Sequence, residues 1–439
     1  MVRRFFFSVF GTILTGAALL VGAPSPAGSV DLSVITNETR LSFKVVLVGN
    51  MERKERSYLT RKAEALVKKD LIETGYFEIL TPPPPLALSL DREPFDAVSA
   101  RSVSSLGAEG VVGMQFALAA DGTTLHGVVR DPLNGAILLD KIYRTGGKYS
   151  ELVHRFVDDI LFQFAGIRGV ATSRIAFVGK TRRGYDLFTM DFDGENARRM
   201  TFDHVLAFNP AWSRDKRHIF YVTYLHGDPQ IIDYDLSTGS RHMLFAYPGL
   251  NITPTVSPDG ARLAVALSRG RASQHTQIYL YTFATKSLVR LTYSSSNSLS
   301  PTFAPSGNAL AFVSDRDGHP QIFLMDSDGS NLHRLTFDGS YNVAPAWSPR
   351  GDWIAYVCMN DLHRPKICLI SPDGSSRIMI TRGAGRDDSP SWSPDGRFLL
   401  YTRQIRGHST LARIWIDGHG RELLGHYRRS VLTPSWSGP

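Results

Sequence analysis

The chain has 439 residues, a formal net charge of +8, 43% hydrophobic residues and two cysteines. The positive surplus is modest for this length, and no basic run or RNA-binding motif accompanies it, which argues against a nucleic-acid-binding class. The two cysteines do not form a zinc-spaced set.

Residues 1–27 have the features of a secretory signal peptide. A basic start at Arg3 and Arg4 precedes the uncharged apolar run Phe5–Val21, and a small-residue stretch follows that ends at Ala27. We expect cleavage near Ala27 after ordinary Sec export, because the residues that flank a twin-arginine signal are missing. The run is short for a membrane span and prolines follow it at once, which disfavours a membrane anchor. Export would lower the net charge to +6, because it removes two arginines.

Residues 28–168 predict a separate, non-repetitive α+β domain. Hydrophobic periodicity predicts helices over Lys54–Glu73, Asp96–Leu106 and Tyr149–Phe164. Four consecutive prolines, Pro82–Pro85, should exclude regular structure between the first two helices. The predicted strands are Phe43–Val48, Tyr76–Leu80 and an antiparallel set formed by Gly110–Phe116, Thr124–Val129 and Ile137–Tyr143.

Residues 169–439 repeat one short phrase six times: proline, any residue, a large apolar residue, then Ser or Ala and a turn. The copies begin at Pro210, Pro254, Pro301, Pro345, Pro390 and Pro434, in steps of 44, 47, 44, 45 and 44 residues. A period near 45 residues is typical of a β-propeller. The turn Ser-Pro-Asp-Gly at residues 257–260 and 393–396 supplies hairpin chemistry after the phrase.

Each phrase is followed by further strand-like runs, which together predict six four-stranded blades. The first repeat enters at its second strand near Arg174, and nothing follows the last phrase at Pro434. We therefore expect Thr433–Ser437 to supply the innermost strand of the first blade and to close the ring. Losing the last six residues should destabilise the whole propeller.

Motifs for catalysis are absent from the sequence: there is no Gly-x-Ser-x-Gly elbow and no His-Glu-x-x-His. Gly179-Lys180-Thr181 resembles the end of a phosphate loop but lacks its first glycine. Asp191-Phe-Asp193-Gly194 resembles the opening of a calcium loop but lacks the distant Glu, so we interpret it as a hairpin turn. We expect no cofactor and no metal.

The two cysteines, Cys358 and Cys368, flank the turn between the second and third strands of one blade. A disulfide is compatible with an oxidising compartment, and two buried free thiols are equally compatible with the pattern.

The whole mature chain resembles the TolB family of the Tol-Pal system. The resemblance rests on the Pro-x-Trp/Phe-Ser-Pro-Asp-Gly repeats, the terminal Pro434-Ser-Trp-Ser437, the segment Ser105–Gly113, and Gly166-Ile-Arg-Gly169 leading into Thr172–Phe177. It implies a periplasmic, non-enzymatic protein, monomeric and peripheral to membranes, that links the inner membrane to the outer membrane and peptidoglycan. It also implies a role in outer-membrane integrity and in constriction of that membrane during cell division.

In the family, loops that enter each Pro-x-Trp strand bind the peptidoglycan-associated lipoprotein, Pal. Loops ring one mouth of the channel and differ in sequence, and such loops are where recognition commonly resides. Carried over by position, the resemblance implies partner-binding residues at Asn251, Ile252, Thr253, Ser298, Leu299, Asn342, Val343, Asp387 and Asp388.

The family's second contact is a segment just after signal cleavage that binds the inner-membrane protein TolA. Here that segment is residues 30–39, in which Leu32, Val34 and Ile35 could add a strand to a partner's sheet. If both contacts exist, Pal binding could change whether this segment is free or docked, which would be a reciprocal coupling.

The alternative is a periplasmic propeller enzyme or carbohydrate-binding protein that acts on cell-wall material. Its candidate residues are Asp387 and Asp388, a tight acidic pair at the inferred mouth. The absence of a catalytic motif favours the binding class.

Overall fold

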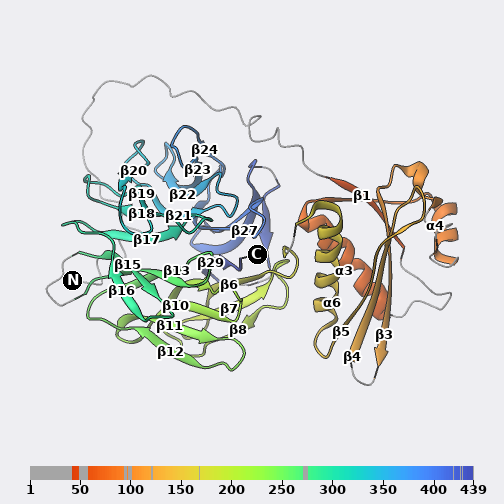
Figure 1. Ribbon diagram of the computed structural model, residues 1–439, viewed down its shortest axis with the longest axis horizontal. Helices are drawn as coiled ribbons and strands as arrows, with labels where there is room; N and C mark the ends of the chain where they lie inside the picture. The colour runs from red at the N-terminus through yellow and green to blue at the C-terminus, as the bar shows by residue number, and fades with distance from the viewer. Residues whose placement is uncertain are drawn as a thin grey trace.

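The computed structural model describes residues 42–48, 58–92, 96, 101–119, 122–167, 169–269, 275–418, 420–425, 427 and 429–438. These residues form a six-bladed β-propeller and a smaller α+β domain beside it (Figure 1). The predicted fold class is therefore confirmed. The predicted signal peptide and the segment 30–39 lie outside the described residues.

The N-terminal domain is built on one five-stranded mixed sheet in the order β2-β1-β3-β4-β5. Its strands are β1 (Phe43–Val48), β2 (Phe77–Leu80), β3 (Gly110–Ala119), β4 (Gly122–Arg130) and β5 (Ile137–Thr145). The predicted antiparallel set is confirmed as β3-β4-β5, and β1 pairs in parallel with both β2 and β3. Parallel neighbours need crossover connections, which the helices between these strands provide.

Helices α3 (Tyr58–Thr74) and α6 (Tyr149–Ala165) lie between this sheet and the propeller, whereas α4 (Pro84–Arg92) lies on the other side of the sheet (Figure 1). The expectation that Pro82–Pro85 exclude regular structure is wrong, because α4 begins at Pro84. A proline in the first helical turn gives up no internal hydrogen bond, since the N–H groups there have no intrahelical partner. Of the helix predicted over 96–106, the described end is a short 3₁₀ turn, η1 (Ser104–Leu106).

The propeller has six four-stranded antiparallel sheets, numbered here in chain order. Blade 1 comprises β29 (Val431–Trp436), β6 (Arg174–Lys180), β7 (Tyr185–Asp191) and β8 (Arg198–Arg199); blade 2, β9 (Ala207–Trp212), β10 (His218–His226), β11 (Asp228–Asp235) and β12 (Arg241–Phe245); blade 3, β13 (Asn251–Val256), β14 (Arg262–Leu267), β15 (Gln277–Thr282) and β16 (Ser287–Arg290). Blade 4 comprises β17 (Ser298–Phe303), β18 (Ala309–Ser314), β19 (Gln321–Asp326) and β20 (His333–Arg334); blade 5, β21 (Val343–Trp347), β22 (Ile354–Met359), β23 (Pro365–Ile370) and β24 (Arg377–Met379); blade 6, β25 (Arg386–Trp392), β26 (Phe398–Ile405), β27 (His408–Trp415) and β28 (Glu422–Leu424).

The last strand of the chain closes the ring as predicted. Strand β29 pairs antiparallel with β6, so that Trp436 lies opposite Ile175. The Trp436 indole Nε1 donates to Ser173 Oγ at 2.7 Å, and Ser437 Oγ accepts from the Arg174 backbone N–H at 2.9 Å. The two ends of the propeller sequence therefore form one blade.

A single hydrophobic cluster joins the N-terminal domain to the closing blades. It contains Leu71 and Phe156 from the helices together with Ile175, Phe398 and Trp436 from blades 1 and 6. Gly75, at φ 74°, lies directly against the Trp415 ring, where a Cβ atom would be 1.6 Å from a ring carbon. Because this close approach excludes any side chain at residue 75, the interface is fixed by packing and by backbone shape.

Among the described residues, no helix is both long enough and apolar enough to cross a bilayer.

Candidate functional site

The two faces of the propeller differ because the strands of each blade alternate in direction. The turns that follow the innermost strands, such as the one with Asp395, lie on one face, and the N-terminal domain docks there: Tyr76 donates to Asp395 Oδ2 at 3.0 Å. Loops that enter the innermost strands lie on the opposite face. We call that second face the mouth face.

Every innermost strand carries a bulge at the same place, immediately before the proline of the repeated phrase. The residue there has a positive φ, between 39° and 56°, although none of the six is glycine. The pairing register shifts at each of these positions, as expected for a bulge. The six residues, which line the channel and are here called the bulge ring, are Asn209, Thr253, Ser300, Ala344, Ser389 and Thr433.

Hydrogen bonds join neighbouring members of the bulge ring. Thr253 Oγ1 accepts from the Ser300 backbone N–H at 3.2 Å, and Thr433 Oγ1 accepts from the Asn209 N–H at 3.1 Å. The part of the channel toward the N-terminal-domain face has a volume of about 510 Å³. The part at the mouth face, here called the mouth pocket, is smaller, with a volume of about 120 Å³. The bulge ring lines both parts, so it is the common wall between them.

Five of the nine residues predicted for partner binding line the mouth pocket together. They are Ile252, Thr253, Leu299, Val343 and Asp388, which come from blades 3 to 6. Leu299 and Val343 are partly exposed, and Ile252 is 6% exposed. The result is a concave and largely apolar surface with one carboxylate at its edge, which is the composition expected of a recognition pocket.

Three other predicted residues are buried and hold the loops in place. Asn251 Nδ2 donates to the carbonyls of Tyr247 and Pro229 at 2.7 and 3.0 Å, so it bridges two segments. Asn342 Nδ2 donates to Gln321 Oε1 at 2.8 Å, and Ser298 has no exposed surface. Their side chains support the mouth from beneath rather than presenting polar atoms to a ligand.

The acidic pair splits into two different environments. Asp387 is fully buried between Lys366 Nζ at 3.2 Å and Arg403 Nη1 at 3.0 Å. Burial raises the pKa of the Asp387 carboxyl, while the two cations oppose that shift. Asp388 lines the mouth pocket, and burial raises the pKa of its carboxyl as well. The hydrogen bond that the Ser389 backbone N–H donates to Asp388 Oδ1 at 2.6 Å opposes this shift. Because Asp387 is held in an internal ion pair, the two carboxylates do not face a common substrate position.

The structure adds residues that the sequence reasoning missed. Phe208, Leu250 and Tyr341 also line the mouth pocket. All three stand before the repeated phrase, either in the first residues of the innermost strand or in the loop that enters it. In five of the six repeats an aromatic or aliphatic residue stands two to four positions before the proline, and this signal was available in the sequence; the repeat at Pro390 has Arg386, Asp387 and Asp388 there.

Cys358 and Cys368 form a disulfide with a Cα–Cα distance of 5.9 Å. The bond connects strands β22 and β23 of blade 5, and both residues are buried in the core between blades 4 and 5. Of the two alternatives left open by the sequence, the structure has the disulfide.

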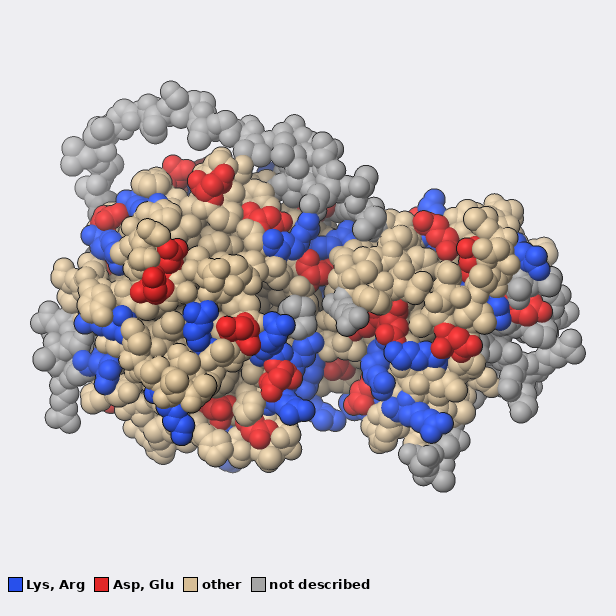
Figure 2. Space-filling view, in the orientation of Figure 1, with Lys and Arg blue, Asp and Glu red and all other residues tan. Residues whose placement is uncertain are grey.

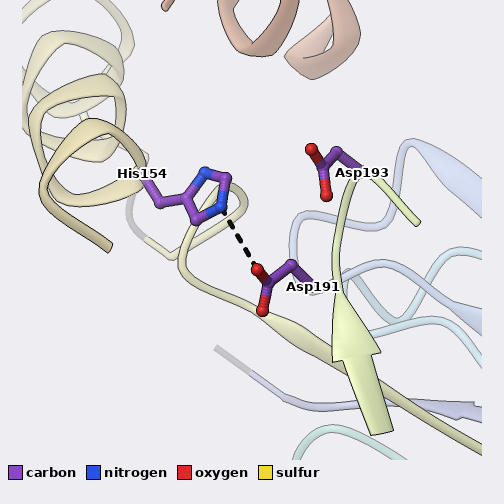
Figure 3. A group of neighbouring side chains, drawn as sticks. All are labelled: His154, Asp191 and Asp193. Carbon is purple, nitrogen blue, oxygen red and sulfur yellow. Dashed lines mark ion pairs between the residues drawn. The ribbon is translucent and has the colours of Figure 1, made fainter. Parts of the chain in front are cut away.

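A second polar cluster lies between the two domains, on the face opposite the mouth (Figure 3). His154 projects from α6 toward Asp191, at the end of β7, and Asp193 lies in the turn that follows. His154 Nδ1 is 2.8 Å from Asp70 Oδ2 of α3, and Nε2 is 3.6 Å from Asp191 Oδ2. Lys69 Nζ is 3.2 Å from Asp193 Oδ2. The cluster therefore connects two helices of one domain to a hairpin of the other.

The charge on His154 follows from these neighbours. Burial opposes protonation, but the carboxylates of Asp191 and Asp70 outweigh it and raise the pKa of His154 to about 10. The ligand atoms of His154, Asp191 and Asp193 lie within 4.8 Å of one another, a spacing that would suit a metal ion. A metal ion would have to displace the imidazolium proton and the Lys69 ammonium. The residues therefore fit a set of ion pairs between the two domains better than a metal site.

Charges on the face of the molecule shown in Figure 2 are mixed. Lys and Arg side chains alternate with Asp and Glu over both domains on the face shown in Figure 2. A surface of this kind produces no broad field of one sign.

Comparison with known proteins places the chain in a family context. Residues 162–439 match the family described as TolB beta propeller domain. The chain is 33% identical over 264 residues to a protein TolB homolog of Chlorobium chlorochromatii, covering 59% of this chain and 58% of that protein. It is 31% identical over 176 residues to the Tol-Pal system protein TolB of Francisella tularensis, covering 38% and 40%. These matches span less than two thirds of either curated relative.

A solved structure agrees over a greater length. The crystal structure of TolB from Acinetobacter baumannii aligns with 91% of this chain and 97% of its own length, at 26% identity and a TM-score of 0.74. The alignment therefore extends over both domains of this chain.

Proposed function

Since this chain belongs to the TolB β-propeller family, we propose that it is a non-enzymatic adaptor of a Tol-Pal system, located in the periplasm. In this role the propeller binds Pal at its mouth face, and residues 30–39 bind TolA. The adaptor thereby links the inner membrane to the outer membrane and peptidoglycan, supporting envelope integrity and constriction at division.

The mouth pocket is the observation that carries this proposal. Ile252, Leu299, Val343 and Tyr341 form an apolar hollow on the face that the N-terminal domain leaves open. A few residues near the centre of a protein interface, in well-packed pockets from which water is excluded, supply most of its binding energy. The loops that carry them are held rigidly from below by Asn251 and Asn342, so little ordering entropy is lost on binding.

Calorimetric titration of a Pal domain into residues 28–439 tests the proposal. A Leu299→Arg variant places a charge in the hollow and should weaken saturable binding by at least about tenfold. Leu332→Arg is the matched control, because Leu332 is 40% exposed in the turn between β19 and β20, on the opposite face.

A melting curve and the milder Leu299→Ala variant show whether loss of binding reflects loss of fold. Intermediate weakening in Leu299→Ala, with an unchanged control, supports binding at the mouth. Wild-type binding that survives Leu299→Arg, or that Leu332→Arg also abolishes, contradicts the assignment of this face. Absence of any binding contradicts the assigned partner.

A further inference from the structure

A second cavity opens on the mouth face beside blade 1. It has a volume of about 580 Å³, and Lys180, Arg182, Arg183, Arg199 and Arg429 contribute to its walls. Three connections meet there: the β6–β7 turn, the loop after β8, and the segment that enters β29. No residue of this cavity lines the mouth pocket, so the two are separate sites on one face.

The cavity has a surplus of positive charge. Arg199 is paired with the buried Asp186, Nη2 to Oδ2 at 2.7 Å. The other four cationic side chains are exposed, and none of them has a carboxylate at ion-pair distance among the described residues. One carboxylate against five cations leaves four positive charges around one concavity. Natural surfaces usually intersperse opposite charges, so an unbalanced group of this size indicates an anionic ligand.

Backbone hydrogen bonds and aromatic packing hold the segments that carry these cations. Tyr427 donates its hydroxyl to the Lys180 carbonyl at 2.8 Å, and its ring packs edge-on against Phe188 with centroids 5.1 Å apart. The Lys180 N–H donates to Ser430 O at 2.8 Å. At Gly184 a Cβ atom would lie 1.9 Å from the His204 carbonyl oxygen, so the turn and the loop touch through their backbones.

Arg199 is oriented as well as charged. It donates to Asp186, its guanidinium lies 4.5 Å from the Phe202 ring centroid, and its Nη2 is 2.9 Å from His204 Nδ1. Because Nε also donates to the Thr201 carbonyl at 2.9 Å, Nη1 is the nitrogen left to donate to a ligand, in a direction set by these contacts. Guanidinium N–H groups are favoured donors to phosphate and carboxylate oxygens.

We propose that this cavity is a binding site for a small ligand that carries two or more oxyanion groups, phosphate or carboxylate. The volume lies within the range of small-ligand sites and leaves room for more than a single phosphate. The Tyr427 ring supplies a flat apolar wall against which a ring of the ligand can pack. This site is independent of the proposed mouth interaction.

Titration with inorganic pyrophosphate at low ionic strength tests the proposal on residues 28–439. We expect saturable binding that weakens as salt is added, because exposed charges are screened. The double variant Arg182→Ala/Arg183→Ala should bind at least about tenfold more weakly, a change worth about 1.4 kcal/mol. The matched control is Arg382→Ala/Arg406→Ala, since both arginines are exposed on the same face outside the cavity.

Comparing the cavity variant with the control variant distinguishes a specific binding site from nonspecific electrostatic attraction of the anion. Selective loss in the cavity variant, with the control within about twofold of wild type, supports the site. Equal loss in both variants, or no saturable binding by the wild type, overturns it. Cosedimentation with phosphatidylglycerol vesicles that pyrophosphate reverses would assign a lipid headgroup as the source of the anion, and its absence a soluble molecule. Leu299→Arg should leave pyrophosphate binding unchanged, so the two proposals can fail separately.

Discussion

Replacing Trp436 with alanine should destabilise the propeller more than the same change at any equivalent partly exposed tryptophan. Trp436 is 5% exposed, packs beside Phe398 and donates to Ser173 across the closure of the ring. Truncating a buried tryptophan costs about 3–5 kcal/mol, which includes the cavity that it leaves. Total stabilities are typically about 5–15 kcal/mol, so this single change should remove a large fraction.

Trp347 occupies the same position of the repeat in blade 5 and provides the matched control. It is partly exposed, and its indole N–H has no hydrogen-bond partner among the described residues. We expect Trp347→Ala to cost about half as much. Urea unfolding followed by tryptophan fluorescence and circular dichroism measures both variants. The melting temperature should fall by about 10 °C in Trp436→Ala.

Comparable losses in the two variants would refute the reasoning, because the ring closure would then contribute nothing beyond ordinary packing. Removal of residues 434–439 should have a larger effect than either substitution, since it also removes the strand pairing with β6. Binding of these variants to partners must be measured below their lowered melting temperatures.

Three further outcomes are expected. The difference in stability between wild type and His154→Gln should be greatest below about pH 6.5 and should decline by up to about 1.4 kcal/mol per pH unit toward pH 10. The reason is that a histidine with a raised pKa stabilises the fold only while its imidazole is protonated. Unfolding at several pH values checks this, and a difference that grows with pH would contradict it. Cys358→Ser/Cys368→Ser should lower the stability by about 3 kcal/mol, as expected for a short loop, and equal melting of the oxidised protein and the variant would count against this contribution. Ala344→Gly should raise the stability by about 0.5–1 kcal/mol because it relieves a positive φ of 51°, whereas Ala309→Gly, in the ordinary strand β18, should lower it; the same sign in both would disprove strain in the bulge ring.

Most of the propeller could be predicted because its signals are local and repeated. The proline phrase, the hairpin turns and the β-branched runs recur at a fixed period, so an error in one blade is corrected by the other five. The closure through Thr433–Ser437 could be predicted by counting strands, because the first repeat enters at its second strand and the last phrase supplies one strand more. The signals in the N-terminal domain are weaker. Its sheet order requires parallel pairings between distant segments, and a helix begins at Pro84, within a run of prolines that predicts no regular structure.

The candidate sites were less accessible to sequence reasoning. Position in the repeat identified the mouth loops, but it could not distinguish Leu299, which faces the pocket, from Ser298, which is buried next to it. Alternation along a strand separates such neighbours only when the register and the bulge are known. The basic cavity combines residues from both ends of the propeller sequence, so its charge surplus appears only after the ring has closed.

The hydrophobic cluster shared by the two domains has a mechanical consequence. The N-terminal domain packs against blades 1 and 6, and blade 1 contains the pairing of β29 with β6, at which the ring closes without a covalent link. A pulling force applied to the N-terminal domain would enter the propeller at blades 1 and 6 and load the β29–β6 ladder before it reached blades 2 to 5. The N-terminal domain therefore also covers the pairing at which the ring would open, so release of the domain and opening of the ring should be coupled.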